Sequence, residues 1–202
     1  MKFVLATANP GKVKEMREIL SELGIDIITR NDLGIDIEVE ETGTTFLENA
    51  TIKAEAICAA SGLPAIADDS GLMVDALGGE PGVYSSSYGG EDLTAEKRCD
   101  YLLSKMKNME QRGAKFVCTI VCCYPDGTKI AATGECLGEI DTKPHGSGGF
   151  GYDPVFRLFR PDGTDKTMAE LSAEEKNLIS HRGKALRNFV ELLKSNKAGK
   201  NI

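Results

Sequence analysis

Two adjacent aspartates, Asp68 and Asp69, follow the short apolar segment 65–67 and precede Ser70 and Gly71. Carboxylates beside a buried strand are costly to desolvate unless a cation or hydrogen-bond donors meet them. Mg²⁺ suits such a place, because it prefers oxygen ligands and commonly binds one or two carboxylates together with substrate phosphates. We therefore expect a magnesium-dependent site for a phosphorylated small molecule. The alternative is a turn in which one aspartate accepts a hydrogen bond ahead of Gly71.

An acidic pair further upstream could complete this site. Glu40 and Glu41 supply two more carboxylates in an irregular stretch. The alternative for each is a solvated position in an acidic loop. Lys53 lies one helical turn after Asn49 in a predicted helix, so both side chains share a face that can look towards an anion. Most helical lysines face solvent, and that is the alternative for Lys53.

A polar loop near the start of the chain favours an anion. Residues 7–12 stand between a predicted strand and a predicted helix, where backbone N–H groups and the helix dipole attract negative charge and Lys12 adds a full positive charge. The spacing is not that of a Walker loop. An ordinary helix start, with Asn9 as the cap and Pro10 in the first helical position, is the alternative, and taken alone the loop favours it.

Two later motifs offer groups that suit a nucleotide base. Residues 150–153 place aromatic faces and one acceptor beside flexible glycine backbone, which suits a planar base as well as a turn. His181 and Arg182 supply donors at a break between predicted helices. A structural histidine and a surface salt bridge are their alternatives. Ser70 lacks the Gly-x-Ser-x-Gly turn of a serine hydrolase, so no serine triad is expected.

The elements that must position these groups alternate between strands and helices. Residues 45–48 and 172–175 have capping-box spacing, and glycine or proline follows several apolar helical faces. The predicted strands are 2–6, 25–28 and 65–67, with a hairpin of 115–124 and 129–140; the predicted helices begin at 10, 45, 93 and 172. The period-two hairpin after the alternating units predicts an α/β fold with a mixed sheet. Residues 1–194 are expected to form one domain and residues 195–202 a polar tail.

Composition excludes several classes of protein. A net charge of −7 with scattered basic residues argues against a nucleic-acid-binding face. No apolar run approaches the roughly 20 residues that cross a bilayer, and the start turns polar too soon for a signal peptide, so we expect no membrane association and a cytoplasmic location. The six cysteines lack zinc spacing and stand in apolar contexts, which predicts reduced core thiols. Cys122 and Cys123 are interpreted as a buried strand pair.

Six motifs, in this order, closely resemble the noncanonical purine nucleoside triphosphate pyrophosphatases, the Ham1 or inosine triphosphatase family in its bacterial form. The resemblance covers residues 1–193. The motifs are Thr7-Ala8-Asn9-Pro10-Gly11-Lys12, Glu40-Glu41-Thr42-Gly43, Phe46-Leu47-Glu48-Asn49-Ala50, Ala67-Asp68-Asp69-Ser70-Gly71-Leu72, Gly149-Phe150-Gly151-Tyr152-Asp153-Pro154 and Ser180-His181-Arg182-Gly183.

The resemblance implies an elongated α/β fold, with a long mixed sheet flanked by helices and two lobes around a central cleft, and a homodimer. It implies hydrolysis of XTP, ITP and dITP to the monophosphate and pyrophosphate, which cleanses the nucleotide pool. Asp69 matches the family's proton acceptor and, with Glu41, its Mg²⁺ ligands. The residues that match substrate-binding positions are Thr7, Ala8, Asn9, Pro10, Gly11, Lys12, Ser70, Phe150, Gly151, Tyr152, Asp153, Lys176, His181 and Arg182.

These matches lead to a mechanistic hypothesis. Asp69 or Asp68 orients water onto the α-phosphorus, while Lys12 and catalytic Lys53 neutralise charge on the leaving pyrophosphate. Donors of the 181–182 segment or of the backbone serve O6 of a 6-oxo purine, which adenine lacks. Two alternatives remain: a related pyrophosphatase for modified pyrimidine nucleotides, and a nucleotide sensor without turnover.

Overall fold

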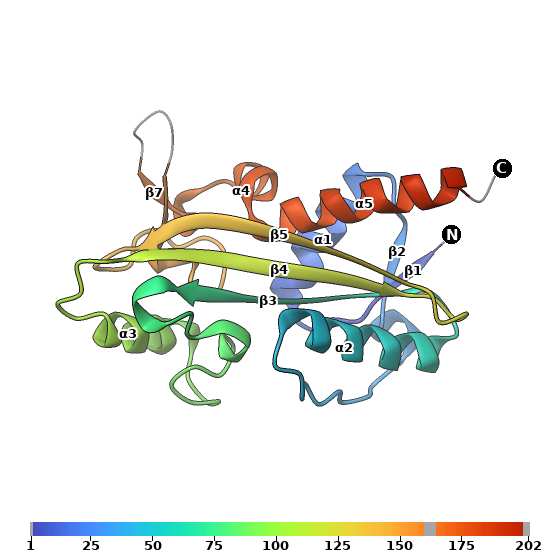
Figure 1. Cartoon of the computed structure of the whole chain (residues 1–202), viewed down its shortest axis with the longest axis horizontal. Coiled ribbons are helices and arrows are strands. Elements are labelled where there is room, and N and C mark those ends of the chain that lie inside the picture. Colours follow the sequence, from blue (N-terminus) through green and yellow to red (C-terminus); the bar gives the residue numbers. More distant parts are fainter. Residues whose placement is uncertain (1, 160–164, 200–202) are drawn as a thin grey trace. The chain divides into compact units, whose positions relative to one another are not determined.

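A computed structural model of the chain describes residues 2–159 and 165–199. Strands and helices alternate through the first part of the chain, and the longest strands lie in its middle (Figure 1). The elements are β1 Phe3–Leu5, α1 Pro10–Glu22, β2 Ile27–Thr29, α2 Phe46–Ser61, β3 Ala65–Val74, α3 Ala95–Lys105, β4 Gly113–Cys123, β5 Lys129–Ile140, β6 Phe156–Leu158, β7 Lys166–Thr167, α4 Ala173–Ile179 and α5 His181–Gly199.

The strands form one mixed sheet in the order β2-β1-β3-β4-β5-β6-β7. β1 pairs in parallel with β2 and with β3, and its register with β3 sets Val4 opposite Ala65. β6 runs antiparallel to both β5 and β7. The predicted α/β class and the mixed sheet are therefore confirmed.

The starts of α1, α2 and α4 are those that the sequence predicts, whereas α3 begins at Ala95, two residues after the predicted start, with Thr94 as its cap. The Asn9 side chain caps α1 and Pro10 occupies its first turn. Thr45 and Ser172 each form a complete capping box with the glutamate three residues later. After 172 the chain forms two helices, because Ser180 is extended and separates α4 from α5. The last helix continues to Gly199, so part of the expected tail is helical, and residues 200–202 lie outside the described part.

The strand that carries the aspartates is longer than predicted. β3 runs without interruption from Ala65 to Val74, so Asp68 and Asp69 lie inside a strand and not at its end. Their interpretation as turn residues ahead of Gly71 is wrong. Because the two aspartates interrupt the apolar pattern, the sequence alone suggested that the strand stopped at Ala67. Cationic side chains of the flanking helices, Lys12, Lys53 and Arg182, pair with the two carboxylates and allow them to lie within a buried strand.

The chain divides into two compact units, each with its own core. Unit 1 comprises residues 1–69, 118–134 and 181–202, and unit 2 comprises residues 70–117 and 135–180. In unit 2, one cluster joins α3, β6 and parts of the long strands, with Leu102, Phe116, Val155 and Phe156 fully or almost fully buried.

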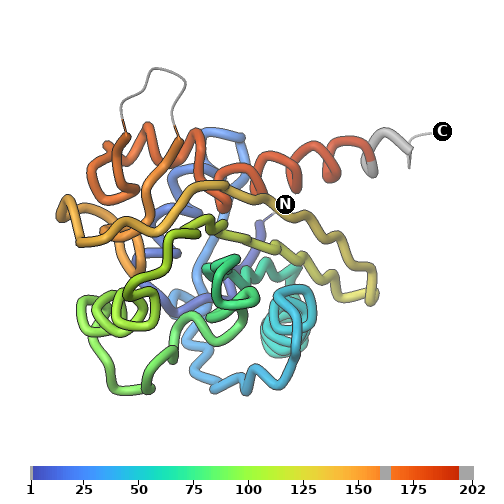
Figure 2. Tube along the Cα trace, turned by 60° about the vertical axis from the view of Figure 1, so that its left-hand side comes forward, coloured from blue at the N-terminus to red at the C-terminus, as the bar shows by residue number. Residues whose placement is uncertain are grey.

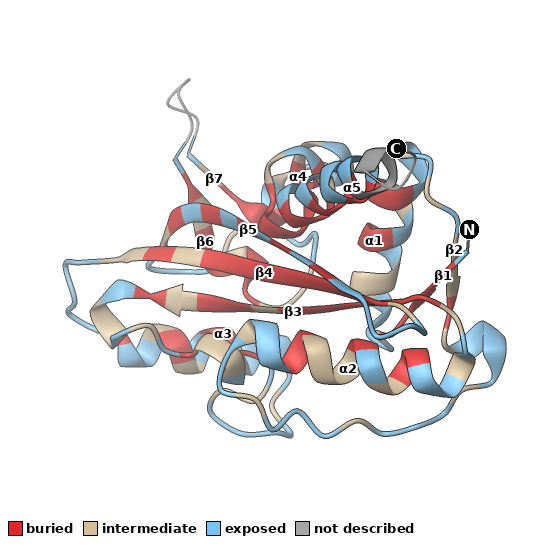
Figure 3. Cartoon of the chain, turned by 45° about the vertical axis from the view of Figure 1, so that its right-hand side comes forward, coloured by how far each residue is buried: buried red, intermediate tan, exposed pale blue. Residues whose placement is uncertain are grey.

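Unit 1 has helices on both faces of its strands. Leu5 and Ile66 pack with apolar residues of α1 and α5, whereas Val4, Ala65 and Ala67 pack with those of α2. Alternate residues of a strand point to opposite faces, so this division follows from the pleat. Figure 3 shows the strands buried between these helices. A long segment after β2 runs back beside α2 to reach its first turn (Figures 1 and 2).

The cysteines are reduced and buried, as predicted. All six are free thiols, and Cys122 and Cys123 both lie in β4. Across residues 2–159 and 165–199, no helix combines the length and apolar character needed to cross a membrane.

Candidate active site

The pleat of β3 separates the two aspartates. Asp68 has the parity of Ile66, which faces α1 and α5, and Asp69 has the parity of Ala67, which faces α2. Adjacent in sequence, the two carboxylates therefore meet different helices and different partners. This difference decides what each of them can do.

Asp68 is held by two cations from the helices on its face. Its Oδ2 lies 3.0 Å from Lys12 Nζ and 3.2 Å from Arg182 Nη2, and its side chain is 0% exposed. Burial alone would raise the pKa of Asp68, but Lys12, Arg182 and Lys53 outweigh burial and hold this pKa well below its ordinary value. Asp68 therefore stays ionised and is a poor proton acceptor.

A further carboxylate holds the arginine in place. Arg182 Nη1 donates to Oε2 of Glu15, which lies one helical turn after Lys12 on α1. The Arg182 side chain is 1% exposed, so the interpretation of Arg182 as a surface salt-bridge residue is wrong. Its contacts favour a role in holding Asp68; donation by Arg182 to a base stays a prediction.

Asp69 is held by two side chains from α2. Lys53 Nζ lies 3.4 Å from Asp69 Oδ1 and 2.8 Å from Glu41 Oε2. The amide of Asn49 donates from Nδ2 to Asp69 Oδ2 at 3.3 Å. Asn49 and Lys53 thus share the helix face that their spacing predicts, and the solvent-facing interpretation of Lys53 is wrong. Of the two upstream glutamates, the structure brings Glu41 to this cluster, whereas Glu40 is exposed and makes no contact with it that the structure records.

The protonation behaviour of Asp69 differs from that of Asp68. Burial raises the pKa of Asp69, and attraction to Lys53 and Lys12 only partly offsets it, while Glu41 adds to the rise. Burial would lower the pKa of Lys53, but the nearby carboxylates, with Asp69 first, raise it above its ordinary value. The cluster therefore pairs a cationic lysine with a carboxylate that binds a proton more readily than an ordinary aspartate.

The donor set around Lys53 suits Mg²⁺. Glu41 and Asp69 both direct oxygens at a single ammonium group, so two anionic oxygen donors already converge where a cation lies. In the described ranges, no group of three or more His, Cys, Asp or Glu side chains is arranged to hold a metal. Mg²⁺ commonly binds two protein carboxylates and takes water and phosphate oxygens as its other ligands.

The loop of residues 7–12 forms a helix cap. Oδ1 of Asn9 accepts from the backbone N–H groups of Gly11 and Lys12, at 3.0 and 3.2 Å, and Thr7 Oγ1 accepts from the N–H of Asn9. Of the two interpretations of this loop, the helix cap is therefore confirmed, and binding of a triphosphate by the loop stays a prediction. Ala8 and Pro10 are exposed. What the loop brings to the carboxylates is the Lys12 side chain.

A second group of predicted residues lies within unit 2. Lys176 Nζ is 2.6 Å from Asp153 Oδ2, and both side chains are buried. The same carboxylate oxygen accepts from the backbone N–H of Phe150 at 2.8 Å, and the Lys176 ammonium lies 4.7 Å from the centre of the Phe150 ring. Gly149 is required here, because a Cβ at this position would lie 2.0 Å from Asp153 Oδ2.

Other predicted residues flank these groups. Tyr152 is buried, and its hydroxyl donates to the backbone oxygen of Ser85 at 3.0 Å. This hydrogen bond supports the loop of residues 149–153 and occupies the hydroxyl proton of Tyr152. Ser70 is partly buried in β3, Gly151 is in a left-handed conformation, and His181 is buried at the start of α5.

Sequence reasoning missed Glu15. It occupies the mostly apolar side of α1, three residues after Lys12, and a glutamate at that spacing shares a helix face with the lysine. A charged residue among Met16, Ile19 and Leu20, all buried, was the available indication that a buried cation lay nearby.

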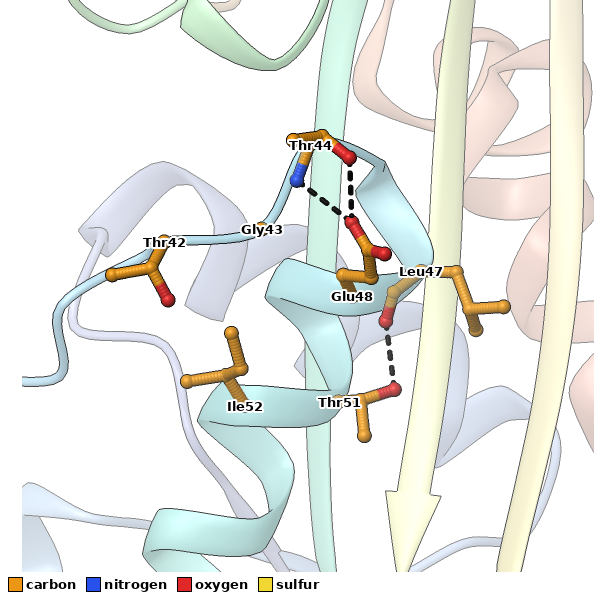
Figure 4. Close-up of a pocket in the computed structure, with 7 residues that line it drawn as sticks. All are labelled: Thr42, Gly43, Thr44, Leu47, Glu48, Thr51 and Ile52. Carbon is orange, nitrogen blue, oxygen red and sulfur yellow. Dashed lines mark hydrogen bonds between the residues drawn. The ribbon is translucent and has the colours of Figure 1, made fainter.

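A hollow lies beside the segment that leads into α2. Its volume is about 490 Å³, and Figure 4 shows the side chains around it. The lining residues are Thr42, Gly43, Thr44, Leu47, Glu48, Thr51 and Ile52. Glu48 points back to Thr44 and accepts hydrogen bonds from its backbone N–H and its hydroxyl, so the segment is fixed to the first turn of the helix.

Comparisons with known proteins agree with this geometry. A sequence profile of the Ham1 family matches residues 3–192. The chain is 50% identical over 198 residues to the dITP/XTP pyrophosphatase of Escherichia coli (strain K12), covering 96% of this chain and 98% of that one. It is 52% identical over 196 residues to the dITP/XTP pyrophosphatase of Thermus thermophilus, covering 96% and 92%. The structure of the Staphylococcus aureus Ham1 protein superposes with a TM-score of 0.85 at 42% identity, covering 97% of this chain and 100% of that one.

Proposed function

The chain belongs to the Ham1 family, and from this premise we propose that it hydrolyses the noncanonical purine nucleoside triphosphates XTP, ITP and dITP to the monophosphate and pyrophosphate. The relatives named dITP/XTP pyrophosphatases match almost the whole chain at about half identity, which supports the same activity here. The observation that carries the mechanism is the separation of Asp68 from Asp69 on opposite faces of β3.

Asp69 is the proton acceptor in this proposal. Its pKa is raised by burial, which improves its ability to take a proton from water, whereas the pKa of Asp68 is lowered by its cations. Asp69 orients a water molecule onto the α-phosphorus and accepts its proton. The bond between the α-phosphorus and the bridging oxygen breaks, and pyrophosphate leaves. Asp68 instead fixes Lys12 and Arg182.

Glu41 and Asp69 are the residues that would hold Mg²⁺. When bound, Mg²⁺ supplies charge neutralisation and orientation for the triphosphate oxygens. Lys53 contacts both carboxylates and contributes its own positive charge beside them. Lys12 adds a second cation at the start of α1, where the helix dipole has the same sign. Both lysines would stabilise the negative charge that develops on the leaving pyrophosphate.

Base recognition is proposed for the unit 2 group. The Phe150 ring offers a stacking face, and the buried Asp153–Lys176 pair fixes the backbone of this loop. A 6-oxo purine presents an acceptor at O6 and a donor at N1, the reverse of adenine. When ATP binds in a pocket matched to the first pattern, buried polar groups of the pocket lose their hydrogen-bond partners. This loss can support discrimination against ATP of several orders of magnitude. The remaining substrate-binding positions, among them His181 and Ser70, are part of the same proposal.

One assay tests the proposed function. The protein is incubated with Mg²⁺ and a panel of XTP, ITP, dITP, ATP, GTP and a methylated pyrimidine triphosphate, and pyrophosphate is measured separately from orthophosphate. We expect pyrophosphate from XTP, ITP and dITP and little product from ATP. Orthophosphate as the sole direct product, preference for the methylated pyrimidine, or tight binding without product would each refute the proposal.

Replacement of the proposed proton acceptor provides the matching mutant test. Asp69→Asn keeps the shape of the side chain but removes its ability to accept a proton, so turnover of XTP should fall to background while the circular dichroism spectrum is unchanged. Near-normal turnover would show that another group takes the proton.

The same proposal includes a homodimer and a cytoplasmic location, for which the family resemblance is the support. Light scattering of the purified protein distinguishes a dimer from a monomer of 21.7 kDa.

A further inference from the structure

We propose that Asn49 is the positioning residue that joins the Glu41 segment to Asp69 and so sets the separation of the two carboxylates. This inference rests on the proposed assignment of Glu41 and Asp69 as the metal-holding pair. Asn49 is distinct from that pair, because it acts through its neighbours and supplies neither charge nor a proton acceptor.

The contacts of Asn49 span two parts of the chain that are far apart in sequence. Its Oδ1 accepts from the backbone N–H of Gly43 at 2.8 Å, two residues after Glu41. Its Nδ2 donates to Oδ2 of Asp69 at 3.3 Å. The residue is 3% exposed, so water does not compete freely for either bond. One buried amide therefore connects the loop to β3.

The amide of Asn49 satisfies both neighbours at once. The backbone N–H of Gly43 can only donate, and an ionised Asp69 can only accept. A side chain between them must present one acceptor and one donor on the same short arm, as asparagine does. Leucine, with a similar volume, keeps the packing and supplies neither bond.

The close approach of the segment depends on Gly43. A Cβ on Gly43 would lie 2.6 Å from Asn49 Oδ1 and 2.6 Å from the Cβ of Glu48, closer than side-chain carbons come. Its φ is not in the left-handed region, so the need for glycine here is one of space. Glu48 accepts from the N–H groups of Thr44 and Thr45, which fixes the next residues to the same turn of α2. Figure 4 shows the bonds to Thr44.

Asn49 and Lys53 act as two parallel links from one helix face. Each contacts Asp69 and each contacts the 41–43 segment, Asn49 through the backbone of Gly43 and Lys53 through the side chain of Glu41. Each oxygen of Asp69 therefore has one partner from α2. If Lys53 shifts when a metal ion binds, the Asn49 link still holds the two carboxylates at a fixed separation.

The test measures metal binding directly, without turnover. Mn²⁺ is titrated into wild type, Asn49→Leu and Gly43→Ala, with no nucleotide present, and free Mn²⁺ is followed by electron paramagnetic resonance. Loss of a residue that orients metal ligands typically weakens metal binding about 10- to 100-fold, and we expect that loss in both variants. Asn188→Leu is the matched control, since Asn188 is exposed and donates to the backbone oxygen of Thr133 at 2.9 Å, away from the carboxylates; its Mn²⁺ affinity should equal that of wild type.

A second readout separates positioning from folding. Thermal unfolding in EDTA reports whether a variant is folded, and the Mg²⁺ concentration that half-saturates XTP hydrolysis should rise about 10- to 100-fold in folded Asn49→Leu, with kcat partly restored at high Mg²⁺. Wild-type Mn²⁺ affinity in Asn49→Leu would overturn the inference. Absence of Mn²⁺ binding by wild type would overturn both the inference and the metal assignment. Failure of the proposed function is a separate result, in which the wild-type protein releases no pyrophosphate from XTP, ITP or dITP.

Discussion

Replacing Asp68 by asparagine should destabilise the fold far more than the same change at Asp69. Asp68 is completely buried, and its Oδ2 contacts both Lys12 and Arg182, at 3.0 and 3.2 Å. An uncharged amide removes the negative charge that both of those cations contact. Removing one partner from a buried ion pair costs about 3–5 kcal/mol, because the remaining charge stays desolvated. For a chain of this length that corresponds to a fall in Tm of roughly 6–20 °C.

The change at Asp69 has a different expected cost. Burial raises the pKa of Asp69, so its charged form is disfavoured by the fold, and Lys53 keeps Glu41 as a partner when Asp69 is neutral. Asp69→Asn should therefore shift Tm much less than Asp68→Asn, although we expect it to abolish turnover.

Urea and thermal unfolding of both variants, in EDTA and without nucleotide, measures this contrast. Glu191→Gln is the control, because Glu191 pairs with Lys194 on the surface and its loss should leave Tm unchanged. Equal shifts for Asp68→Asn and Asp69→Asn, or an Asp68→Asn protein as stable as wild type, would refute the assignment of the two aspartates to different faces.

Two further predictions concern unit 2 and the thiols. Lys176→Met removes the ammonium partner of the buried Asp153 carboxylate, so we expect a lower Tm and a higher KM for XTP; an unchanged KM would contradict the proposed role in base recognition. Burial raises the pKa of Cys99 to about 11 and that of Cys118 and Cys122 to about 12, so these thiols should not react with Ellman's reagent at pH 8 until the protein unfolds. Because unfolding restores ordinary thiol pKa values of about 8.5, stability should decline as pH rises above that value. Rapid labelling of the native protein would show that the thiols are accessible.

The elements could be predicted where local chemistry decides them. The Asn9 cap, the Thr45 capping box and the hairpin turn after Tyr124 each depend on residues within a few positions, and the structure confirms them. The length of β3 could not be predicted in the same way. Its two aspartates are stabilised by partners that include Lys12 and Arg182, residues 56 and 114 positions away from Asp68 in the chain.

The structure brings together several residues that the sequence singles out, but the sequence did not predict how they divide between the two faces of β3. The motifs singled out Lys12 and Asp69, and helical spacing from Asn49 singled out Lys53, but a list of residues does not say that alternate strand positions face opposite helices. That division required knowing that Asp68 and Asp69 belong to one continuous strand. Glu15 was missed for a related reason: it contributes to the site by accepting a hydrogen bond from Arg182, which lies 167 positions away in the chain.

Hydrolysis of XTP in water enriched with ¹⁸O tests the central claim most directly. If a water molecule held by Asp69 attacks the α-phosphorus, mass spectrometry will find one ¹⁸O atom in each XMP product and none in the pyrophosphate. Label in pyrophosphate or in orthophosphate, with unlabelled XMP, would place the attack on another phosphorus and contradict the account.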